Sequence, residues 1–395
     1  MVSSKQITPN KNILVGTLGR GGRGVYALDV TNPGSFVSAD VEWDIRNIAD
    51  LGHVTGKPFI AKLNNGRTGV VIGNGFNSDS DEAVLLVLDI ENGSVIARIP
   101  TDESTNNGLS APRGWDQDGN GTLDYVYAGD LQGNMWKFDL SSSNSNGWEV
   151  ALGSGNNPEP LFVATNDDNE RQPITGGVSI GIDPATYKRW VFFGTGKMIE
   201  PNDPVDRSVQ SMYGIIDEGD EVGDRDQSLV ERTTSAVGTI AGRTVRSFES
   251  SSLEIPANKD GWYIDFAPPA PGTAQGERIV GDPAVVAQVL LFSSIIPDAN
   301  PCLPGGEGFL NALNAFTGAS VPEHFFDVDG DGQYSDDEVG GNAVGSVNTG
   351  VGMPTDGLLI EKIIGVGGSG GNTGSVGVNN PAASGRVSWR ELVTD

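Results

Sequence analysis

Two short acidic segments carry the residue types and spacing that bind a hard cation. The first is Asp116-Gln-Asp-Gly-Asn-Gly-Thr-Leu-Asp124, in which oxygen-bearing side chains fall at alternate positions. Alternate side chains of a tight loop turn toward one point, and Ca²⁺ takes about six to eight oxygen ligands. The predicted ligands are Asp116, Asp118, Asn120, the backbone carbonyl of Thr122, and Asp124.

This first segment is shorter than the calcium loop of EF-hand proteins. Position 12 is Tyr127, where that loop carries a glutamate. Asp124 at position 9 therefore has to close the site, which makes it more compact. The alternative is an acidic turn without an ion, but clustered carboxylates repel one another when no cation lies between them.

The second segment, Asp327 to Glu338, fits the complete twelve-residue pattern. Its predicted ligands are Asp327, Asp329, Asp331, the carbonyl of Gln333, Ser335 and Glu338. The flanking sequence does not predict two long helices, so we expect an EF-hand-like loop rather than a full EF-hand. An ion here could serve structure alone by pinning a long loop. One or two Ca²⁺ ions are therefore expected.

Short β-rich runs that end in glycine repeat along the chain. Roughly 55 to 65 residues separate successive copies, a period typical of propeller blades. The glycines are Gly16, Gly73, Gly129 and Gly194. A second strand follows each copy and ends in aspartate, and a fifth copy begins at Val289. Three or four antiparallel strands per repeat predict blades that stack around an axis.

We therefore expect an all-β fold, a single β-propeller over residues 1–395 with about seven blades and irregular insertions. Five repeats are recognisable, and residues 352–389 supply a partial sixth. Residues 200–260 are polar and predict a long insertion over one face. Residues 365–380 are rich in glycine and are predicted to be flexible.

The composition suits many short strands and excludes two kinds of partner. The chain has 56 glycines and 22 prolines, and only 19% of its residues are charged. Its net charge of −27 repels phosphate backbones, so we expect no nucleic acid partner. No apolar run approaches the roughly 20 residues of a membrane span, so we expect no transmembrane segment in this chain.

The single cysteine and the first residues bear on the cellular compartment. Cys302 lies in a loop-like Pro-Cys-Leu-Pro-Gly-Gly setting and is predicted to be an unpaired thiol or to pair outside this sequence. The opening residues, Met-Val-Ser-Ser-Lys-Gln, lack the apolar region of a signal peptide. The chain is thus either cytosolic or a piece of a longer secreted protein, and composition does not decide between these.

Catalytic patterns are sparse. The two histidines, His53 and His324, are far apart in sequence and are predicted to be structural. The chain has no Gly-x-Ser-x-Gly elbow and no His-Glu-x-x-His motif. Residues 167–170, Asp-Asp-Asn-Glu, are predicted to form a solvated turn. We therefore expect no enzymatic activity.

Residues 113–140, which contain the first acidic segment and the Tyr-Val-Tyr-Ala-Gly-Asp run, resemble a blade of the PilY/PilC family of type IV pilus proteins. The Pro-Cys-x-x-Gly-Gly segment at 301–306 and Gly-Arg-Val-Ser-Trp-Arg-Glu-Leu at 385–392 resemble the C-terminal end of the same family. The resemblance implies a quinoprotein-like propeller at the C-terminus of a longer secreted protein. It also leaves room for a partner of Cys302.

The resemblance implies a function as well. In that family the nine-residue loop binds Ca²⁺, with occupancy linked to pilus extension against retraction; this role is carried onto Asp116, Asp118, Asn120, Thr122 and Asp124. Members are associated with minor pilins, the pilus tip, twitching motility and adhesion to host or abiotic surfaces. The expected location is the cell surface, pilus tip or outer membrane and periplasm of a Gram-negative bacterium. An Arg-Gly-Asp tripeptide is absent, so integrin-type binding is not supported.

Two other functions remain open at the level of sequence. A quinone-dependent dehydrogenase on a similar propeller would hold Ca²⁺ beside pyrroloquinoline quinone in a central cavity. The chain lacks the adjacent cysteine pair that some of those enzymes stack on the quinone. A glycan-binding propeller is the third possibility.

Overall fold

The computed structural model describes residues 1–46, 48–101, 105–154, 157–267, 274–299 and 305–381. In these ranges the chain forms strands and turns, with a single α-helix of four residues, α1 (Arg225–Ser228). Five 3₁₀ helices are also present: η1 (Gly19–Gly21), η2 (Pro33–Ser35), η3 (Ser38–Asp40), η4 (Ser145–Gly147) and η5 (Asp203–Val205). No described helix has the length and hydropathy needed to cross a membrane. The prediction of an all-β fold is confirmed.

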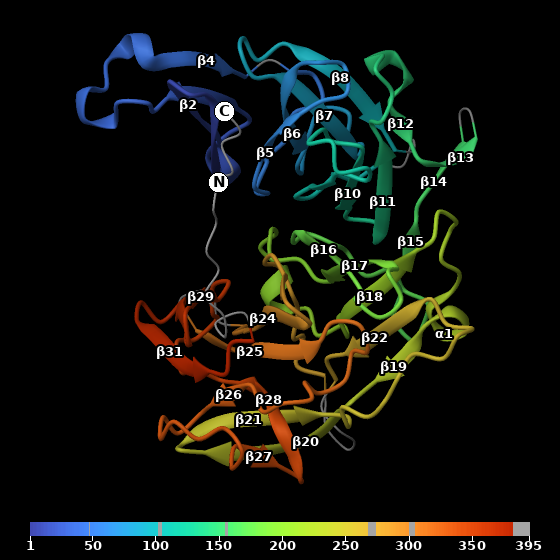
Figure 1. The fold of residues 1–395 in the computed structure, drawn as a ribbon, viewed down its shortest axis with the longest axis vertical. Helices are drawn as coiled ribbons and strands as arrows, with labels where there is room; N and C mark the ends of the chain where they lie inside the picture. The colour runs from blue at the N-terminus through green and yellow to red at the C-terminus, as the bar shows by residue number, and fades with distance from the viewer. Residues whose placement is uncertain (47, 102–104, 155–156, 268–273, 300–304, 382–395) are drawn as a thin grey trace, which may run out of the picture.

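The first half of the chain forms three antiparallel sheets, which Figure 1 shows in the upper part of the molecule. The first sheet consists of β1 (Val2–Thr8), β2 (Lys11–Thr17), β3 (Val25–Asp29) and β4 (Val41–Ile45). The second consists of β5 (Phe59–Lys62), β6 (Thr68–Gly73), β7 (Val84–Asp89) and β8 (Val95–Pro100). The third consists of β9 (Arg113–Trp115), β10 (Tyr125–Gly129), β11 (Asn134–Asp139), β12 (Glu149–Val150) and β15 (Phe162–Val163). A separate hairpin joins β13 (Leu152–Ser154) to β14 (Asn157–Glu159).

The second half forms three more sheets. The fourth consists of β16 (Val178–Ile182), β17 (Arg189–Gly194), β18 (Ser211–Asp217), β22 (Gly261–Asp265) and β19 (Val230–Arg232), which pairs in parallel with β22. The fifth consists of β20 (Thr234–Ile240), β21 (Arg243–Phe248), β28 (Asn342–Val347), β25 (Gly306–Asn314), β24 (Val289–Pro297), β23 (Ala284–Val286) and β27 (Glu338–Val339). The sixth consists of β26 (Phe326–Asp327), β31 (Thr373–Val378), β30 (Ile363–Gly367) and β29 (Leu358–Ile360).

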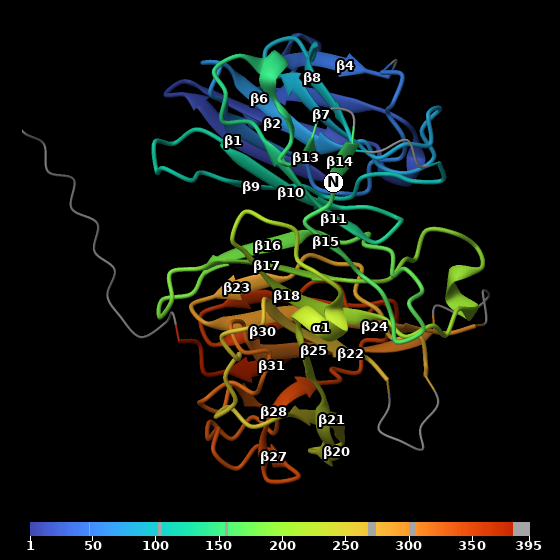
Figure 2. The same ribbon diagram turned by 90° about the vertical axis from the view of Figure 1, so that its right-hand side faces the viewer.

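The propeller architecture is confirmed, but the prediction of about seven blades is wrong. The structure has five blades with the predicted repeat. The sixth sheet, whose β30–β31 hairpin has no aspartate at the end of its second strand, comes mostly from the region predicted as a partial blade. The count failed because β20, β21, β27 and β28 join the fifth sheet and form no blade of their own. Figure 2 shows β20, β21 and β27 projecting at the lower end of the molecule.

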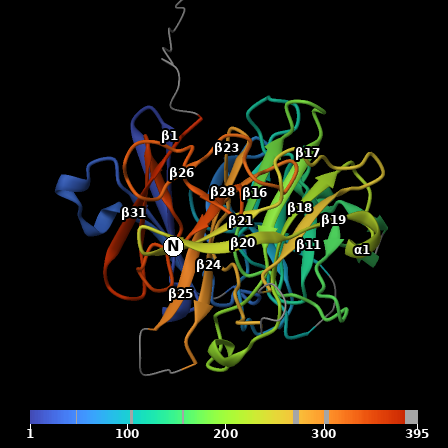
Figure 3. The same cartoon turned by 90° about the horizontal axis from the view of Figure 1, so that it is seen from below.

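Two other predicted segments differ from expectation. Residues 200–260 contain β18 and β19 of the fourth blade and β20 and β21 of the fifth, so this segment is not only a cover over one face. Figure 3 shows α1 from this segment at the outer edge, beside β19. Residues 365–380, predicted to be flexible, include most of the β30–β31 hairpin, in which Val366 and Val376 are buried.

The hydrophobic core lies between neighbouring blades. In β6, Val70 and Ile72 pack toward the first sheet, whereas Val71 packs toward the third. Successive side chains of a strand point to opposite faces, so a blade covered on both faces needs a continuous apolar run. This explains why every residue of β7 is buried.

The aspartate that ends each second strand of the repeat forms a turn. A carboxylate oxygen accepts the backbone N–H two residues further on, as Asp29 does from Thr31 and Asp89 from Glu91. Asp139 and Asp217 do the same, and Asn314 takes this place in the fifth blade. Aspartate and asparagine favour this turn because the side chain replaces a backbone acceptor.

In the second, third and fourth blades, the glycine that ends the first strand of the repeat makes room for the next blade. A Cβ atom on Gly73 would lie 2.0 Å from the carbonyl oxygen of Ser110, and one on Gly129 would lie 2.1 Å from Cγ2 of Ile174. Ser110 and Ile174 belong to the segments that lead into the following blades. The repeat therefore requires glycine at these positions because two segments approach closely.

Candidate metal sites

The first acidic loop connects β9 to β10 in the third blade. β9 ends at Trp115 and β10 begins at Tyr125, so both ends of the loop are held by sheet hydrogen bonds. Carboxylate oxygens of Asp116, Asp118 and Asp124 all lie within 4.8 Å of one another. Asp124 is buried, whereas Asp118 is exposed. The structure thus brings together the three carboxylates that the spacing predicted.

Backbone amides of the loop hold the first carboxylate in place. Asp116 Oδ1 accepts the N–H of Gly119 at 2.8 Å, and its Oδ2 accepts the N–H of Gly121 at 2.7 Å. Both glycines have positive φ, 75° and 85°, a conformation that favours glycine over other residues. The glycines therefore let the loop fold back over the carboxylate of Asp116.

The next two oxygen-bearing side chains also accept amides within the loop. Asp118 Oδ1 accepts the N–H of Asn120 at 3.1 Å, and Asn120 Oδ1 accepts the N–H of Thr122 at 2.7 Å. The Asp118 carboxylate keeps lone pairs that are free for a further partner. These hydrogen bonds fix the side chains of Asp118 and Asn120 within the loop that Asp116 begins.

A residue of the second blade, which sequence reasoning missed, supports the loop. The Asn64 amide group donates to Asp124 Oδ1 at 3.0 Å and to the carbonyl oxygens of Leu123 and Leu140 at 2.9 and 3.1 Å. Its Oδ1 accepts the hydroxyl of Thr122 at 2.8 Å. Asn64 follows β5, and its only sequence signal is the Asn-Asn-Gly turn in which it lies.

The fourth blade also contacts the loop. Gln117 Oε1 accepts Trp115 Nε1 at 3.1 Å and a guanidinium N–H of Arg189, at the start of β17. The N–H of Gln117 donates to Asp124 Oδ2 at 2.7 Å. The first loop is thus connected to both neighbouring blades.

The second acidic loop repeats the hydrogen bonds of the first. Asp327 Oδ1 accepts the N–H of Gly330 at 2.8 Å, and its Oδ2 accepts the N–H of Gly332 at 3.2 Å. Carboxylate oxygens of Asp327, Asp329 and Asp331 lie within 4.8 Å of one another. Gln333 N donates to Asp331 Oδ1 at 2.7 Å. Two loops distant in sequence have therefore adopted the same local fold.

The C-terminal end of the second loop departs from the predicted ligand set. Glu338 Oε1 lies 3.0 Å from His324 Nε2, and Glu338 is not among the three converging carboxylates. Asp337, which the spacing did not single out, is buried and accepts the N–H of Val328 at 3.0 Å. Asp337 occupies the place that Asp124 has in the first loop. No contact of the Ser335 side chain supports its predicted role, which stays a prediction.

The environment of Asp337 is short of positive charge. Burial, together with the nearby carboxylates Asp329, Asp327 and Asp336, raises the pKa of Asp337 to about 6, although the hydrogen bond from the Val328 amide opposes this. Close carboxylates disfavour each other's ionised form unless a cation lies among them. The donor sets of both loops, carboxylate and carbonyl oxygens, are those that hard cations such as Ca²⁺ take.

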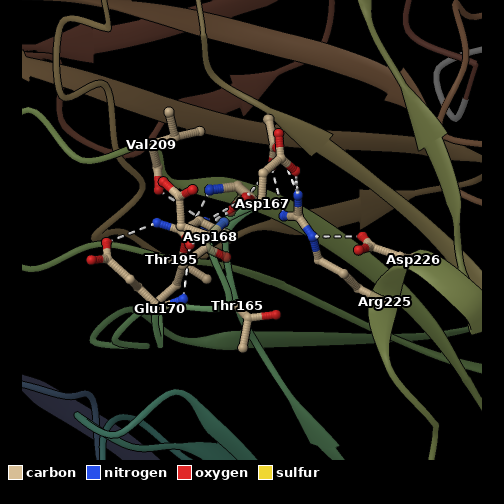
Figure 4. A network of polar contacts seen from close by, with 12 residues as sticks. Thr165, Asp167, Asp168, Glu170, Thr195, Val209, Arg225 and Asp226 are labelled. Carbon is tan, nitrogen blue, oxygen red and sulfur yellow. Dashed lines mark hydrogen bonds and ion pairs between the residues drawn. The ribbon is translucent and has the colours of Figure 1, made fainter.

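The structure separates the other residues that could do chemistry. His53 Nδ1 lies 3.2 Å from the carbonyl oxygen of Gly19 in the first blade, whereas His324 lies beside the second loop. Figure 4 shows the turn at Asp167, where the carboxylate receives a hydrogen bond from the buried guanidinium of Arg225. Arg225 also binds Asp265 at 2.9 Å, so this network ties α1 to the fourth blade. Cys302 and residues 385–392 lie outside the described residues.

The fold and the two loops define a class: an all-β propeller with acidic loops that suit hard cations. Residues 2–248 match the family model of the PilY1 beta-propeller domain. Since this match covers more than half of the sequence, the chain belongs to the PilY1 propeller family. The resemblance stated from residues 113–140 is confirmed.

Relatives and a solved structure extend the comparison beyond residue 248. The chain is 36% identical to a type IV pilus biogenesis factor PilY1 homolog of Xylella fastidiosa, over 97% of this chain and 30% of the relative. It is 33% identical to PilY1 of Pseudomonas aeruginosa, over 80% of this chain and 30% of the relative. The crystal structure of the P. aeruginosa PilY1 C-terminal domain matches with a TM-score of 0.81 and 30% identity, covering 96% of this chain and 84% of that one. The chain thus spans about a third of the length of these curated relatives.

Proposed function

We propose that this chain is a calcium-binding propeller of a type IV pilus biogenesis factor. In this proposal an ion in the Asp116 loop controls pilus extension against retraction, and with it twitching motility and surface adhesion. The observation that carries the proposal is the convergence of three carboxylates in a loop held between blades, in a chain of the PilY1 family. The role proposed for the domain is non-enzymatic.

The contacts of the loop suggest how an ion would act. Three carboxylates within 4.8 Å repel one another, and a divalent cation removes that repulsion and orders the loop. Asn64 and Arg189 connect the loop to the second and fourth blades, so an ordered loop stabilises two blade interfaces at once. Ion occupancy would thereby alter the surface that neighbouring pilus proteins contact.

The proposed partners are minor pilins at the pilus tip and a host or abiotic surface. The proposed location is the cell surface, the pilus tip or the outer membrane and periplasm of a Gram-negative bacterium. Both proposals are supported by the pilus function in the names of the relatives. The second loop, at Asp327, is proposed to hold a structural ion that fixes the connection between β26 and β27.

The proposed function is tested by introducing substitutions into the chromosomal gene of a bacterium that encodes this chain, and by measuring surface pili and twitching motility. The double variant Asp116→Asn/Asp124→Asn should reduce surface pili and twitching, because it removes two of three charges that hold the ion. Asp183→Asn is a matched control: Asp183 also caps an exposed turn, accepting from Ala185, but lies in no carboxylate cluster. Normal piliation and twitching in the double variant, at normal protein level, would contradict the proposal.

A further inference from the structure

A cavity of about 420 Å³ lies at the centre of the propeller. Its lining comes from β1, β5, β9 and β16 and from the residues that lead into β23. Each of these strands is the edge strand of its sheet, and neighbouring ones contact one another around the centre. We call this space the axial cavity. Its volume is within the usual range of small-molecule sites, about 300 to 1,000 Å³.

Positive side chains gather in the axial cavity. Lys57 and Lys62 come from the second blade, Arg113 from the third and Lys5 from the first, and all four are exposed. Lys5 donates to the carbonyl oxygen of Ile60 at 3.2 Å. Within the described ranges, no carboxylate forms an ion pair with any of these four residues.

This gathering of positive charge contrasts with the acidity of the whole chain, in which acidic residues outnumber basic ones by 52 to 25. The carboxylates that line the cavity are Asp116, which is held by its own loop, and Asp282. Four cations from three blades therefore line one concave space, and none of them forms an ion pair with a described carboxylate.

We propose that the axial cavity binds a small multivalent oxyanion, such as a di- or tricarboxylate. Lysine and arginine side chains on a concave surface focus positive potential and form charge-assisted hydrogen bonds with carboxylate or phosphate oxygens. Arg113 presents a fork of donors that suits two oxygens of one group, whereas Lys57 and Lys62 act as point charges. The partly buried rings of Phe59 and Trp115 supply apolar contact for the carbon skeleton.

The proposal is tested by calorimetric titration of the whole chain in calcium-free buffer of low ionic strength. The probes are tricarballylate, a tricarboxylate that chelates Ca²⁺ weakly, and inorganic phosphate. The wild type should bind at least one probe, and Lys57→Gln/Arg113→Gln should weaken that binding about tenfold or more, because each lost charge-assisted bond lowers affinity. Lys188→Gln, which removes a surface cation paired with Glu218, should leave it unchanged.

Each outcome decides one part of the proposal. Binding of tricarballylate assigns carboxylates, and binding of phosphate alone assigns phosphates, provided that the double variant loses the same binding. Failure of the wild type to bind either probe, or equal binding by a folded double variant, overturns the proposal. Asp116→Asn/Asp124→Asn should bind the probe at least as tightly as the wild type, so failure of the metal site and failure of this site are distinguishable.

Discussion

Both acidic loops are organised by the aspartate at their first position. Asp116 and Asp327 each accept backbone N–H groups from the glycines three and five residues further on. The carboxylate therefore shapes the loop through these hydrogen bonds. The loops differ in the later aspartate that accepts the backbone N–H of the residue after this first aspartate. It is Asp124 in the first loop and Asp337 in the second.

Asn64 should be required for full calcium affinity of the first loop, because it supports Asp124. Asn64→Ala removes the donor that orients this carboxylate, and losing such outer partners typically lowers metal affinity about 10- to 100-fold. Calcium titration should show this loss for Asn64→Ala. Asn65→Ala, in the same turn but bonded only to the Arg67 amide, serves as the control and should bind normally. Unchanged affinity in Asn64→Ala would mean that Asp124 needs no support from the second blade.

Among the strands, a buried cluster of charged side chains links the third blade to the fourth. Asp217 at the end of β18 is fully buried and lies 2.8 Å from Lys137 Nζ of β11 and 3.1 Å from Arg189 Nη2. Tyr127 of β10 donates its hydroxyl to the same carboxylate. Two cations and a phenol thus compensate one buried charge, while Arg189 also reaches the first loop through Gln117.

Removing the buried charge should destabilise the protein strongly. Asp217→Asn leaves Lys137 buried without its counter-charge, and breaking a buried pair in this way costs about 3–5 kcal/mol. Lys188→Gln, which removes the exposed pair with Glu218, should cost about 1 kcal/mol or less. Chemical denaturation followed by tryptophan fluorescence compares the two. Similar losses for both variants would refute the structural role of the cluster.

The same cluster has a definite dependence on pH. Burial raises the pKa of Asp217, but hydrogen bonds from Lys137 and Tyr127 and the charges of Lys137 and Arg189 outweigh it, so the pKa lies below its ordinary value of 3.8. A lowered folded pKa contributes stability that is present above 3.8 and disappears as pH falls through the folded value. Denaturation midpoints of wild type and Asp217→Asn should therefore converge at acidic pH. A constant difference down to pH of about 2 would contradict this assignment.

At the scale of the whole molecule, each blade is stabilised mainly by its neighbours. The five hydrophobic clusters each join two successive sheets, from the first and second through to the fifth and sixth. An ion that stabilises one interface between blades should therefore raise the free energy of unfolding of the entire chain. Ca²⁺ at 100 times its Kd should raise the free energy of unfolding by about 2.7 kcal/mol per site. A melting temperature that does not change between chelator and Ca²⁺ would contradict this expectation.

The amino-acid sequence predicted the structural features that depend on the spacing of nearby residues, namely the acidic loops and the hairpins of the blades. The alternating oxygens of 116–124 predicted which carboxylates converge, and glycine and aspartate periodicity predicted the hairpins of five blades. Contacts between segments that are distant in the chain produce no periodic spacing in the sequence, so they were not predicted. Asn64 reaches Asp124 only because the second and third blades pack together, and the hydrogen bond from the Val328 amide to Asp337 depends on the path of the backbone. The blade count failed for the same reason, since β20 and β21 pair with a sheet formed much later in the chain.

Calorimetric titration of the purified, chelator-treated chain shows whether the Asp116 loop binds Ca²⁺. The wild type should bind two ions, one at each loop, and Asp116→Asn/Asp124→Asn should bind one ion fewer while keeping the remaining site. Asp329→Asn/Asp331→Asn should lose the other ion instead. If the Asp116→Asn/Asp124→Asn variant bound Ca²⁺ with the stoichiometry and affinity of the wild type, the first loop would not be a calcium site.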